Sequence, residues 1–259
     1  MNDTRPIGLF DSGVGGTTIW RAIHELLPNE NAIFLADSNN APYGQKSKEE
    51  ILQLSIKNID WLLKNNAKII VIACNTATTN AISDLRNSYD IPIIGVEPAI
   101  KPAAIHSKNG RVGVLATQST ILSKKYKEAQ LQYPNVVFYN QIGYDLVRLI
   151  EEGKLFSPEV KNLLIQYITP MLEGDIDKLV LGCTHYPYLA PILKTFLPNN
   201  IELIDSGKAV ALQTQKILKD KNLLKTDAIE GIVNFFTNKD PFVLDSLVGD
   251  FGSVKKIIF

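Results

Sequence analysis

The two cysteines of the chain stand in matching positions of the sequence. Cys74 and Cys183 each end a short apolar run, and each is followed by residues that form hydrogen bonds, with His185 two positions after Cys183. A free cysteine is more often a small buried hydrophobic residue than a reagent. Two cysteines in the same setting, with no others in the chain, leave a shared chemical role and simple burial as equal alternatives.

Two thiols on opposite sides of a cleft suit the inversion of a carbon centre. One group, as a thiolate, removes a proton from one face of the carbon, and the other, as a thiol, returns a proton to the opposite face. Free cysteine has a pKa of about 8.5, so a thiolate is accessible at neutral pH beside a positive or hydrogen-bonding neighbour. Nearby carboxylates and histidines would orient the thiols or relay their protons.

The elements that must position these thiols are alternating strands and helices. The apolar runs are short, mostly β-branched and continuous, which is typical of strands buried on both faces of a parallel sheet. Amphipathic stretches lie between them, so the sequence predicts an α/β fold with helices on both faces of the sheet. The predicted strands are Ile7–Phe10, Ala32–Ala36, Ile69–Cys74, Ile91–Val96, Val112–Ala116, Val136–Tyr139, Leu179–Cys183, Ile201–Ile204 and Ile232–Phe236. The predicted helices include Lys48–Asn65, Thr78–Ser88, Ser119–Gln132, Ser157–Leu172 and Lys208–Lys219.

The residues that follow each strand are the candidates for a site, because ligands of open α/β sheets bind beyond the carboxyl ends of the strands. Both cysteines belong to this set. Its members are Asp11-Ser12-Gly13, Asp37-Ser38, Cys74-Asn75-Thr76, Glu97, Thr117, Cys183-Thr184-His185 and Asp205-Ser206.

Parts of this set repeat within the chain. The segment from Ile70 to Thr76 resembles the one from Leu179 to His185, and Asp11-Ser12-Gly13 resembles Asp205-Ser206-Gly207. Such an echo is compatible with two similar α/β halves related by a pseudo-twofold axis.

The glycine-rich segment from Gly13 to Thr18 does not match a nucleotide-binding motif. Thr18 stands where a dinucleotide fingerprint has its third glycine, and no Gly-Lys-Ser/Thr follows as in a P-loop. We interpret the segment as a tight strand-to-helix turn with backbone N–H groups near a carboxylate ligand.

Composition and charge argue against several classes of protein. Lys+Arg and Asp+Glu both number 27 in 259 residues, so the basic excess of a nucleic-acid-binding protein is absent. No apolar stretch reaches the roughly 18 residues of a membrane span, and the N-terminus lacks the apolar region of a secretory signal, so we expect a cytoplasmic protein. The histidines and cysteines are scattered, so a metal site is not expected. A structural disulfide is not expected either, because the cytoplasm is reducing.

Together these segments resemble the glutamate racemase family over about residues 7–205, with a looser match through Phe236-Thr237. Six motifs occur in the order that the family shows. They are Asp11-Ser12-Gly13-Val14-Gly15-Gly16; Ala36-Asp37-Ser38 with Ala41-Pro42-Tyr43-Gly44; Ala73-Cys74-Asn75-Thr76-Ala77; Gly95-Val96-Glu97-Pro98; Val112-Gly113-Val114-Leu115-Ala116-Thr117 with Ser119-Thr120-Ile121; and Leu181-Gly182-Cys183-Thr184-His185-Tyr186-Pro187.

The resemblance implies two similar α/β domains, each a mostly parallel sheet flanked by helices, which are pseudo-twofold related with the active site between them. We expect the first domain to comprise residues 1–96 and 207–259, and the second to comprise residues 97–206. The resemblance also implies that the enzyme acts on glutamate without pyridoxal phosphate, another cofactor or a metal, and that it forms a homodimer.

The resemblance further assigns roles to single residues. Cys74 would take the proton from D-glutamate and Cys183 from L-glutamate, with Asp11 assisting near Cys74, His185 near Cys183, and Glu151 as a further carboxylate. The substrate contacts that it implies are Asp11, Ser12, Tyr43, Gly44, Asn75, Thr76, Thr117, Thr120, Thr184 and His185.

One segment departs from the family pattern. Ahead of Glu151 the family often carries a Cys-Pro pair, whereas this chain has Asn140-Gln141-Ile142-Gly143-Tyr144. The alignment is looser here, so Glu152 is an alternative for the assisting carboxylate. A solvated carboxylate at a helix end is the alternative for both.

Other functions stay open. A racemase of aspartate or another acidic amino acid would use the same chemistry, although Thr184-His185-Tyr186-Pro187 favours glutamate. A non-catalytic binder of amino-acid carboxylates would need no second thiol, and a redox protein is disfavoured because the chain has no CxxC. In the cell, the resemblance implies supply of D-glutamate for peptidoglycan. Some family members are regulated through an N-terminal extension, which we do not expect here because the first predicted strand begins at Ile7.

Overall fold

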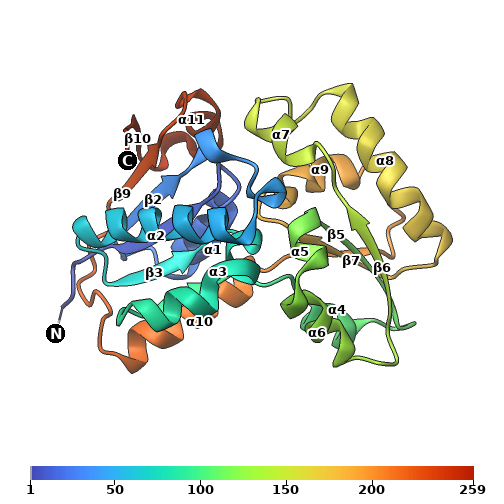
Figure 1. The fold of residues 1–259 in the computed structure, drawn as a ribbon, viewed down its shortest axis with the longest axis horizontal. Helices are drawn as coiled ribbons and strands as arrows, with labels where there is room; N and C mark the ends of the chain where they lie inside the picture. Colours follow the sequence, from blue (N-terminus) through green and yellow to red (C-terminus); the bar gives the residue numbers. More distant parts are fainter. Residues whose placement is uncertain (1) are drawn as a thin grey trace.

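The computed structural model describes residues 2–259, which form two lobes that are each built on a parallel β-sheet (Figure 1). The sheet of the first lobe has the strand order β10-β9-β2-β1-β3-β4, and that of the second lobe has the order β6-β5-β7-β8. Every strand pairing in both sheets is parallel. The strands are β1 (Ile7–Asp11), β2 (Ala32–Ala36), β3 (Ile69–Ile72), β4 (Ile93–Gly95), β5 (Arg111–Ala116), β6 (Val137–Ile142), β7 (Lys178–Gly182), β8 (Glu202–Ile204), β9 (Val233–Thr237) and β10 (Ser253–Lys256).

Helices cover both faces of the first sheet. Because side chains alternate along a strand, Ile7 and Leu9 of β1 join the core on the side of α1 and α10, whereas Phe10 packs with α2 and α3. The predicted α/β class, with parallel sheets flanked by helices, is therefore confirmed. The helices are α1 (Thr17–Leu26), α2 (Lys48–Lys64), α3 (Asn75–Ser88), α4 (Ile100–His106), α5 (Gln118–Leu122), α6 (Lys124–Leu131), α7 (Leu146–Glu151), α8 (Pro158–Glu173), α9 (Ala190–Leu193), α10 (Gly207–Asp220) and α11 (Phe242–Val248). Over residues 2–259, none of the helices has the length and apolar character needed to cross a membrane.

The two sheets repeat one strand order. In β2-β1-β3-β4 and in β6-β5-β7-β8, the second strand of the unit lies on one side of the first strand, and the third and fourth lie on the other side. Cys74 follows β3 and Cys183 follows β7, so the two cysteines occupy equivalent places. The Asp-Ser-Gly echo is different, because Asp11 ends the central strand β1 whereas Asp205 follows the edge strand β8.

The division into domains stays a prediction at the level of residue boundaries. The first sheet takes strands from residues 7–95 and 233–256, and the second takes strands from residues 111–204. In Figure 1 the green-to-orange second lobe lies beside the first lobe, which contains both ends of the chain.

Two elements differ from the prediction by more than shifts of a few residues at their ends. The helix predicted over Ser119–Gln132 is divided into α5 and α6 at Ser123, whose Oγ caps α6 by accepting a hydrogen bond from Tyr126 N–H (3.2 Å). Strand β10 was not predicted from the sequence. It pairs with β9 at the edge of the sheet and carries Lys255 and Lys256, and such charges are common on edge strands but hide the strand pattern.

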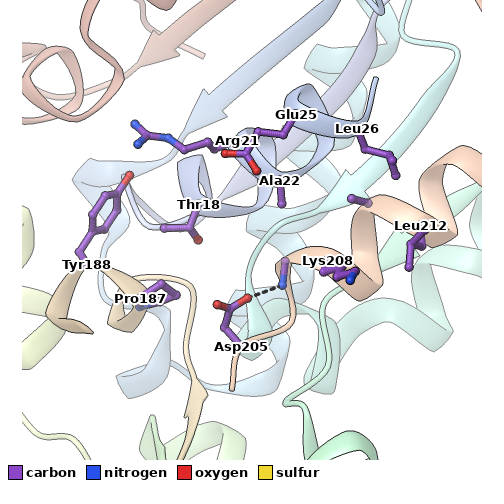
Figure 2. Close-up of a pocket in the computed structure, with 12 residues that line it drawn as sticks. Thr18, Arg21, Ala22, Glu25, Leu26, Pro187, Tyr188, Asp205, Lys208 and Leu212 are labelled. Carbon is purple, nitrogen blue, oxygen red and sulfur yellow. Dashed lines mark hydrogen bonds between the residues drawn. The ribbon is translucent and has the colours of Figure 1, made fainter. Parts of the chain in front are cut away.

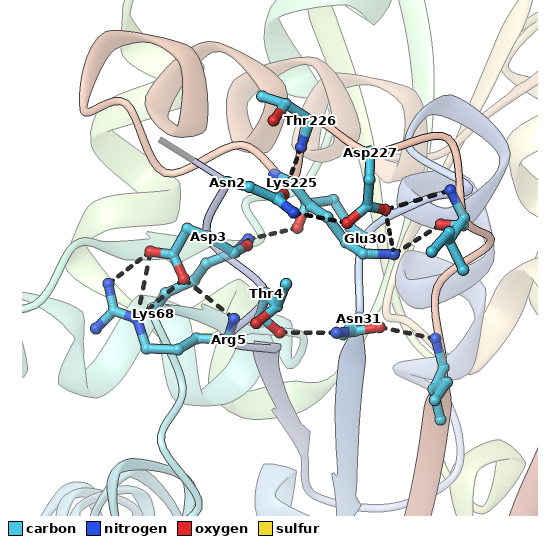
Figure 3. A network of polar contacts seen from close by, with 12 residues as sticks. Asn2, Asp3, Thr4, Arg5, Glu30, Asn31, Lys68, Lys225, Thr226 and Asp227 are labelled. Atoms are coloured by element: carbon cyan, nitrogen blue, oxygen red, sulfur yellow. Dashed lines mark hydrogen bonds and ion pairs between the residues drawn. The ribbon is translucent and has the colours of Figure 1, made fainter.

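Buried charges tie the N-terminal segment to the amino ends of the first sheet (Figure 3). Lys68 and Glu30 form an ion pair of 2.6 Å with side chains 0% and 3% exposed. Lys68 Nζ also donates to the carbonyl oxygen of Asp3 (2.7 Å), and Lys225 N–H donates to Glu30 Oε1 (2.8 Å). Glu30 precedes β2 and Lys68 precedes β3, so this network lies at the strand ends opposite to the predicted site.

Candidate active site

The first thiol lies where β3 passes into α3. Cys74 is the N-cap of α3, and its Sγ accepts a hydrogen bond from Ala77 N–H (3.4 Å). The thiol also donates to Ser12 Oγ, 3.6 Å away on the neighbouring strand end. The strand-to-helix turn therefore places the thiol at the carboxyl edge of the sheet, where parallel α/β sheets bind ligands.

The surroundings of Cys74 favour its protonated form. Burial raises the pKa of the Cys74 thiol well above its usual value, and the charge of Asp11 raises this pKa further. The hydrogen bond from Ala77 N–H opposes these effects but does not outweigh them. The charge of Cys183 also contributes to the rise, so the two cysteines are close enough to interact electrostatically.

Asp11 is a fully buried carboxylate beside Cys74. It ends β1 and accepts hydrogen bonds from Gly16 N–H (2.6 Å) and from Thr184 Oγ1 (3.3 Å), which belongs to the second lobe. Burial raises the pKa of Asp11 to about 6, while the positive charge of His185 opposes the rise. Asp11 can therefore gain and lose a proton near neutral pH.

The second thiol belongs to a buried relay of three side chains. Cys183 follows β7, and its Sγ lies 3.7 Å from His185 Nδ1. The other ring nitrogen, Nε2, lies 2.6 Å from Oε1 of Glu151, the last residue of α7. Cys183, His185 and Glu151 are 7%, 1% and 6% exposed, so the relay is shielded from water.

His185 carries a proton in this arrangement. Burial by itself would lower the pKa of His185, but its hydrogen bonds to Cys183 and Glu151 outweigh burial and hold this pKa well above its usual value. An imidazolium has an N–H group at each ring nitrogen, one toward Cys183 and the other toward Glu151. A positive charge beside a cysteine is the setting in which a thiolate is stabilised.

The structure separates the two candidate carboxylates, Glu151 and Glu152. Glu151 is buried and contacts His185, whereas the side chain of Glu152 is 34% exposed and pairs with Arg148 and Lys154 at the surface. Glu151 is therefore the carboxylate that lies beside the candidate acid/base residues.

The glycine-rich turn after β1 lies against carboxylates of the protein itself. Gly16 N–H donates to Asp11, and Val14 N–H donates to Glu151 Oε1 (2.6 Å). Gly15 N–H points at His185 Nε2 from 3.3 Å. The expected pairing of backbone N–H groups with carboxylates is present, but the carboxylates are side chains of this chain rather than a ligand.

A line of threonines joins the two lobes near the thiols. Thr76 Oγ1, at the start of α3, lies 2.9 Å from Thr117 Oγ1, which in turn accepts a hydrogen bond from Thr120 Oγ1 (2.9 Å). Gly44 packs against the same residue, because a Cβ at Gly44 would lie 3.0 Å from Thr117 Cβ. These four predicted substrate contacts are therefore brought together.

Two other predicted substrate contacts, Tyr43 and Asn75, form hydrogen bonds with other groups of the protein. Tyr43 Oη donates to Asp37 Oδ2 (2.5 Å) and accepts from Asn58 Nδ2 (3.2 Å), and Asn75 Nδ2 donates to the carbonyl oxygen of Val96 (3.1 Å). Their contact with a substrate stays a prediction.

Asp37 and Asn58 support the site, but the sequence did not assign them a role. Asp37 stands after β2 and holds Tyr43, and Asn58 reaches Tyr43 from the middle of α2. The position of Asp37 at a strand end was a usable signal. Asn58 had none, because an asparagine within an amphipathic helix has no distinctive pattern.

A separate cavity of about 610 Å³ lies between α1, α10 and the segment after Cys183 (Figure 2). Thr18, Arg21, Pro187, Tyr188 and Lys208 are among the side chains around it. Asp205 of the strand-end set lines this cavity, but none of the residues with a predicted catalytic or substrate-binding role does.

The side chains of residues 2–259 form no group of three or more His, Cys, Asp or Glu residues that could hold a metal ion. The expectation that the chemistry needs no cofactor stays a prediction.

Comparisons with known proteins agree on one family. The family described as Asp/Glu/Hydantoin racemase matches residues 7–214. The glutamate racemase of Herpetosiphon aurantiacus is 42% identical over 238 residues, which cover 92% of this chain and 94% of that protein.

Solved structures of glutamate racemases share the whole fold. The enzyme isoform from Bacillus anthracis aligns with a TM-score of 0.89 at 29% identity, over 100% of this chain and 99% of that one. The Escherichia coli enzyme, solved with L-glutamate and the activator UDP-MurNAc-ala, aligns with a TM-score of 0.85 at 32% identity, over 98% of each chain.

Proposed function

Because the chain belongs to the Asp/Glu/Hydantoin racemase family, we propose that it interconverts L- and D-glutamate by a two-thiol mechanism that needs no cofactor. The proposal of glutamate rests on the similarity to glutamate racemases over nearly the whole chain. The proposal of two thiols rests on Cys74 and Cys183, which occupy equivalent strand ends of the two lobes.

The different surroundings of the thiols are the observation that carries this proposal. Cys74 is held as a thiol by burial and by Asp11, whereas Cys183 lies beside a protonated His185. Cys74 is thus placed to give a proton and Cys183 to take one. A two-base racemisation requires these two roles. A binding protein would need neither arrangement.

The conversion of L-glutamate to D-glutamate follows from these two roles. Cys183, as a thiolate, takes the Cα proton of L-glutamate, and Cys74, as a thiol, gives its proton to the opposite face, which yields D-glutamate. Cys183 is then a thiol and Cys74 a thiolate, which is the state that accepts D-glutamate for the reverse reaction. His185 and Asp11 stand beside the two sulfur atoms and stabilise or reset these protonation states.

Incubation of the purified, reduced protein with L-glutamate in D2O tests the proposal. We expect loss of optical activity and entry of deuterium at Cα, without any added cofactor. A folded sample that neither racemises glutamate nor exchanges its Cα proton would refute the proposal. Parallel incubation with aspartate tests which acidic amino acid is preferred.

We also propose that the D-glutamate supplies peptidoglycan synthesis and that the protein acts as a homodimer in the cytoplasm, as the resemblance implies. Growth of a D-glutamate auxotroph that expresses this chain would support the cellular role. A molecular mass of a monomer in light scattering would refute the dimer.

A further inference from the structure

Two glycines of the turn after β1 are in closest contact with the second lobe. A Cβ atom added at Gly13 would lie 1.9 Å from Glu151 Oε1, and one added at Gly15 would lie 2.3 Å from His185 Nδ1. Both distances are far below any real Cβ contact. The absence of a side chain at these positions therefore lets the backbone of the first lobe touch the relay residues of the second.

The backbone uses this closeness to form directed contacts. Val14 N–H donates to Glu151 Oε1 at 2.6 Å, and this same oxygen lies 2.6 Å from His185 Nε2. Glu151 and Val14 are both buried, so only a small part of the carboxylate is exposed to water. The turn thereby limits where the carboxylate can lie, and the carboxylate orients the imidazole.

We propose that the glycine loop, residues Gly13–Gly16, is a positioning element that fixes the Glu151–His185 pair for proton transfer at Cys183. The loop comes from the first lobe and the pair from the second, so the packing of the two lobes against each other supports the relay. The inference rests on the proposed racemase function, and it adds that the glycine motif serves the acid/base pair rather than an anionic ligand.

Gly13→Ala is the first test. The added methyl group meets the far end of the Glu151 side chain, which can move, so we expect the variant to fold while the carboxylate leaves His185. Because a displacement of about 1 Å in a catalytic group costs about 100-fold in rate, we expect kcat to fall by about that factor.

The pH profile of Gly13→Ala separates positioning from general damage. The charged and titratable groups that face His185 are Cys183, Glu151 and Asp11. Loss of the Glu151 contact removes one of the interactions that raise the pKa of His185. The basic limb of the kcat profile should therefore move to lower pH. An unchanged kcat and profile in Gly13→Ala would overturn the inference.

Gly113→Ala is the matched control. Gly113 lies in β5, and its added Cβ would meet the movable ends of Ile176 and Met171 at 2.7 and 2.8 Å, away from the relay. We expect this variant to keep the wild-type pH profile, even if its melting temperature falls.

A compensating variant tests the contact directly. In Gly13→Ala/Glu151→Asp the carboxylate is shorter by one methylene, which leaves room for the new methyl group. We expect the second change to restore kcat of Gly13→Ala by about 10-fold, since residues in contact couple by about 1 kcal/mol or more. If kcat of the double variant falls by the product of the factors lost in the two single variants, the proposal is wrong.

Amide exchange gives a readout that does not depend on Gly13→Ala folding. Glu151→Ala removes the acceptor of the Val14 N–H without adding an atom, so exchange of that amide should become faster. Glu152→Ala, which alters a surface residue next in sequence, should leave it unchanged. Equal exchange in both variants would refute the contact, whereas an inactive wild-type protein would refute the racemase proposal instead.

Discussion

At the scale of single residues, the surroundings of the two thiols differ. Burial and Asp11 raise the pKa of Cys74, and the hydrogen bonds to Cys183 and Glu151 raise the pKa of His185. The two cysteines are equivalent in topology but differ in their neighbours. Two predictions belong to this scale.

Each thiol should act on one enantiomer. In Cys183→Ala, Cys74 can still remove the Cα proton of D-glutamate and return it to the same face, so we expect deuterium exchange of D-glutamate without racemisation. Cys74→Ala should exchange only L-glutamate. Racemisation itself should fall by about 10²–10⁴-fold in both variants. Proton NMR in D2O measures the exchange, and the opposite pattern of enantiomers would reverse the assignment of the cysteines.

Asp11 should reduce stability at high pH. Its folded-state pKa of about 6 lies above its ordinary value of 3.8, so its contribution to stability is present below pH 3.8 and is lost as the pH rises through 6. The shift corresponds to about 3 kcal/mol for this fully buried group.

Asp11→Asn cannot ionise, so its free energy of unfolding relative to wild type should be higher at pH 8 than at pH 4, by about 1–3 kcal/mol, while its activity falls. Urea unfolding at the two pH values measures the difference. The same difference at both values would show that Asp11 does not titrate in this range.

At the scale of elements, several candidate site residues are the N-cap residues of helices. Cys74 is the N-cap of α3 and Thr117 is the N-cap of α5, so the group that caps the helix also lies at the carboxyl edge of the sheet. Helix α2 begins with a capping box and supplies Asn58, which contacts Tyr43.

Loss of the α2 cap should affect stability but not activity. Ser47 Oγ accepts from Glu50 N–H (3.2 Å), and Glu50 Oε2 accepts from Ser47 N–H (3.0 Å). Ser47→Ala should lower the free energy of unfolding by about 1 kcal/mol, because Glu50 N–H at the helix start loses the hydroxyl that accepts its hydrogen bond. Ser47→Thr keeps the hydroxyl and should stay near wild type. A large fall of kcat in Ser47→Ala would contradict the separation of cap and site.

At the scale of the whole molecule, the proposed acid/base residues and the buried ion pair lie at opposite ends of the strands. The proposed acid/base residues follow the carboxyl ends, whereas the Lys68–Glu30 pair lies at the amino ends, where Lys225 N–H also contacts Glu30 (Figure 3). A buried ion pair is costly to break from one side only, because the remaining charge has no partner.

Lys68→Met should therefore destabilise the protein by about 3–5 kcal/mol in urea unfolding. Glu30→Gln added to it removes the unpaired charge and should recover part of the loss. The racemisation rate of the folded fraction should stay at the wild-type value, because the network is far along the strands from the thiols. A double variant no more stable than Lys68→Met would contradict the role of the pair.

The local pattern of the sequence was sufficient for the fold class, and it singled out the two thiols, whose role stays a prediction. Continuous β-branched runs and amphipathic stretches predict strands and helices from their own periods, and the carboxyl ends of parallel strands point to Cys74 and Cys183 without a structure. The pattern was insufficient for the edge strand β10, whose lysines interrupt its apolar character, and for the break at Ser123, where a capping hydroxyl starts a new helix.

Tertiary structure decided which side chains meet. The choice of Glu151 over Glu152, the inward direction of Tyr43 and the contact of the glycine loop with His185 all depend on how elements distant in sequence pack together. Residue type and spacing determine which side chains of a segment can react and whether the segment has the period of a helix or of a strand. They do not encode the closeness of Gly13 to Glu151, because that distance arises only when the two lobes pack against each other.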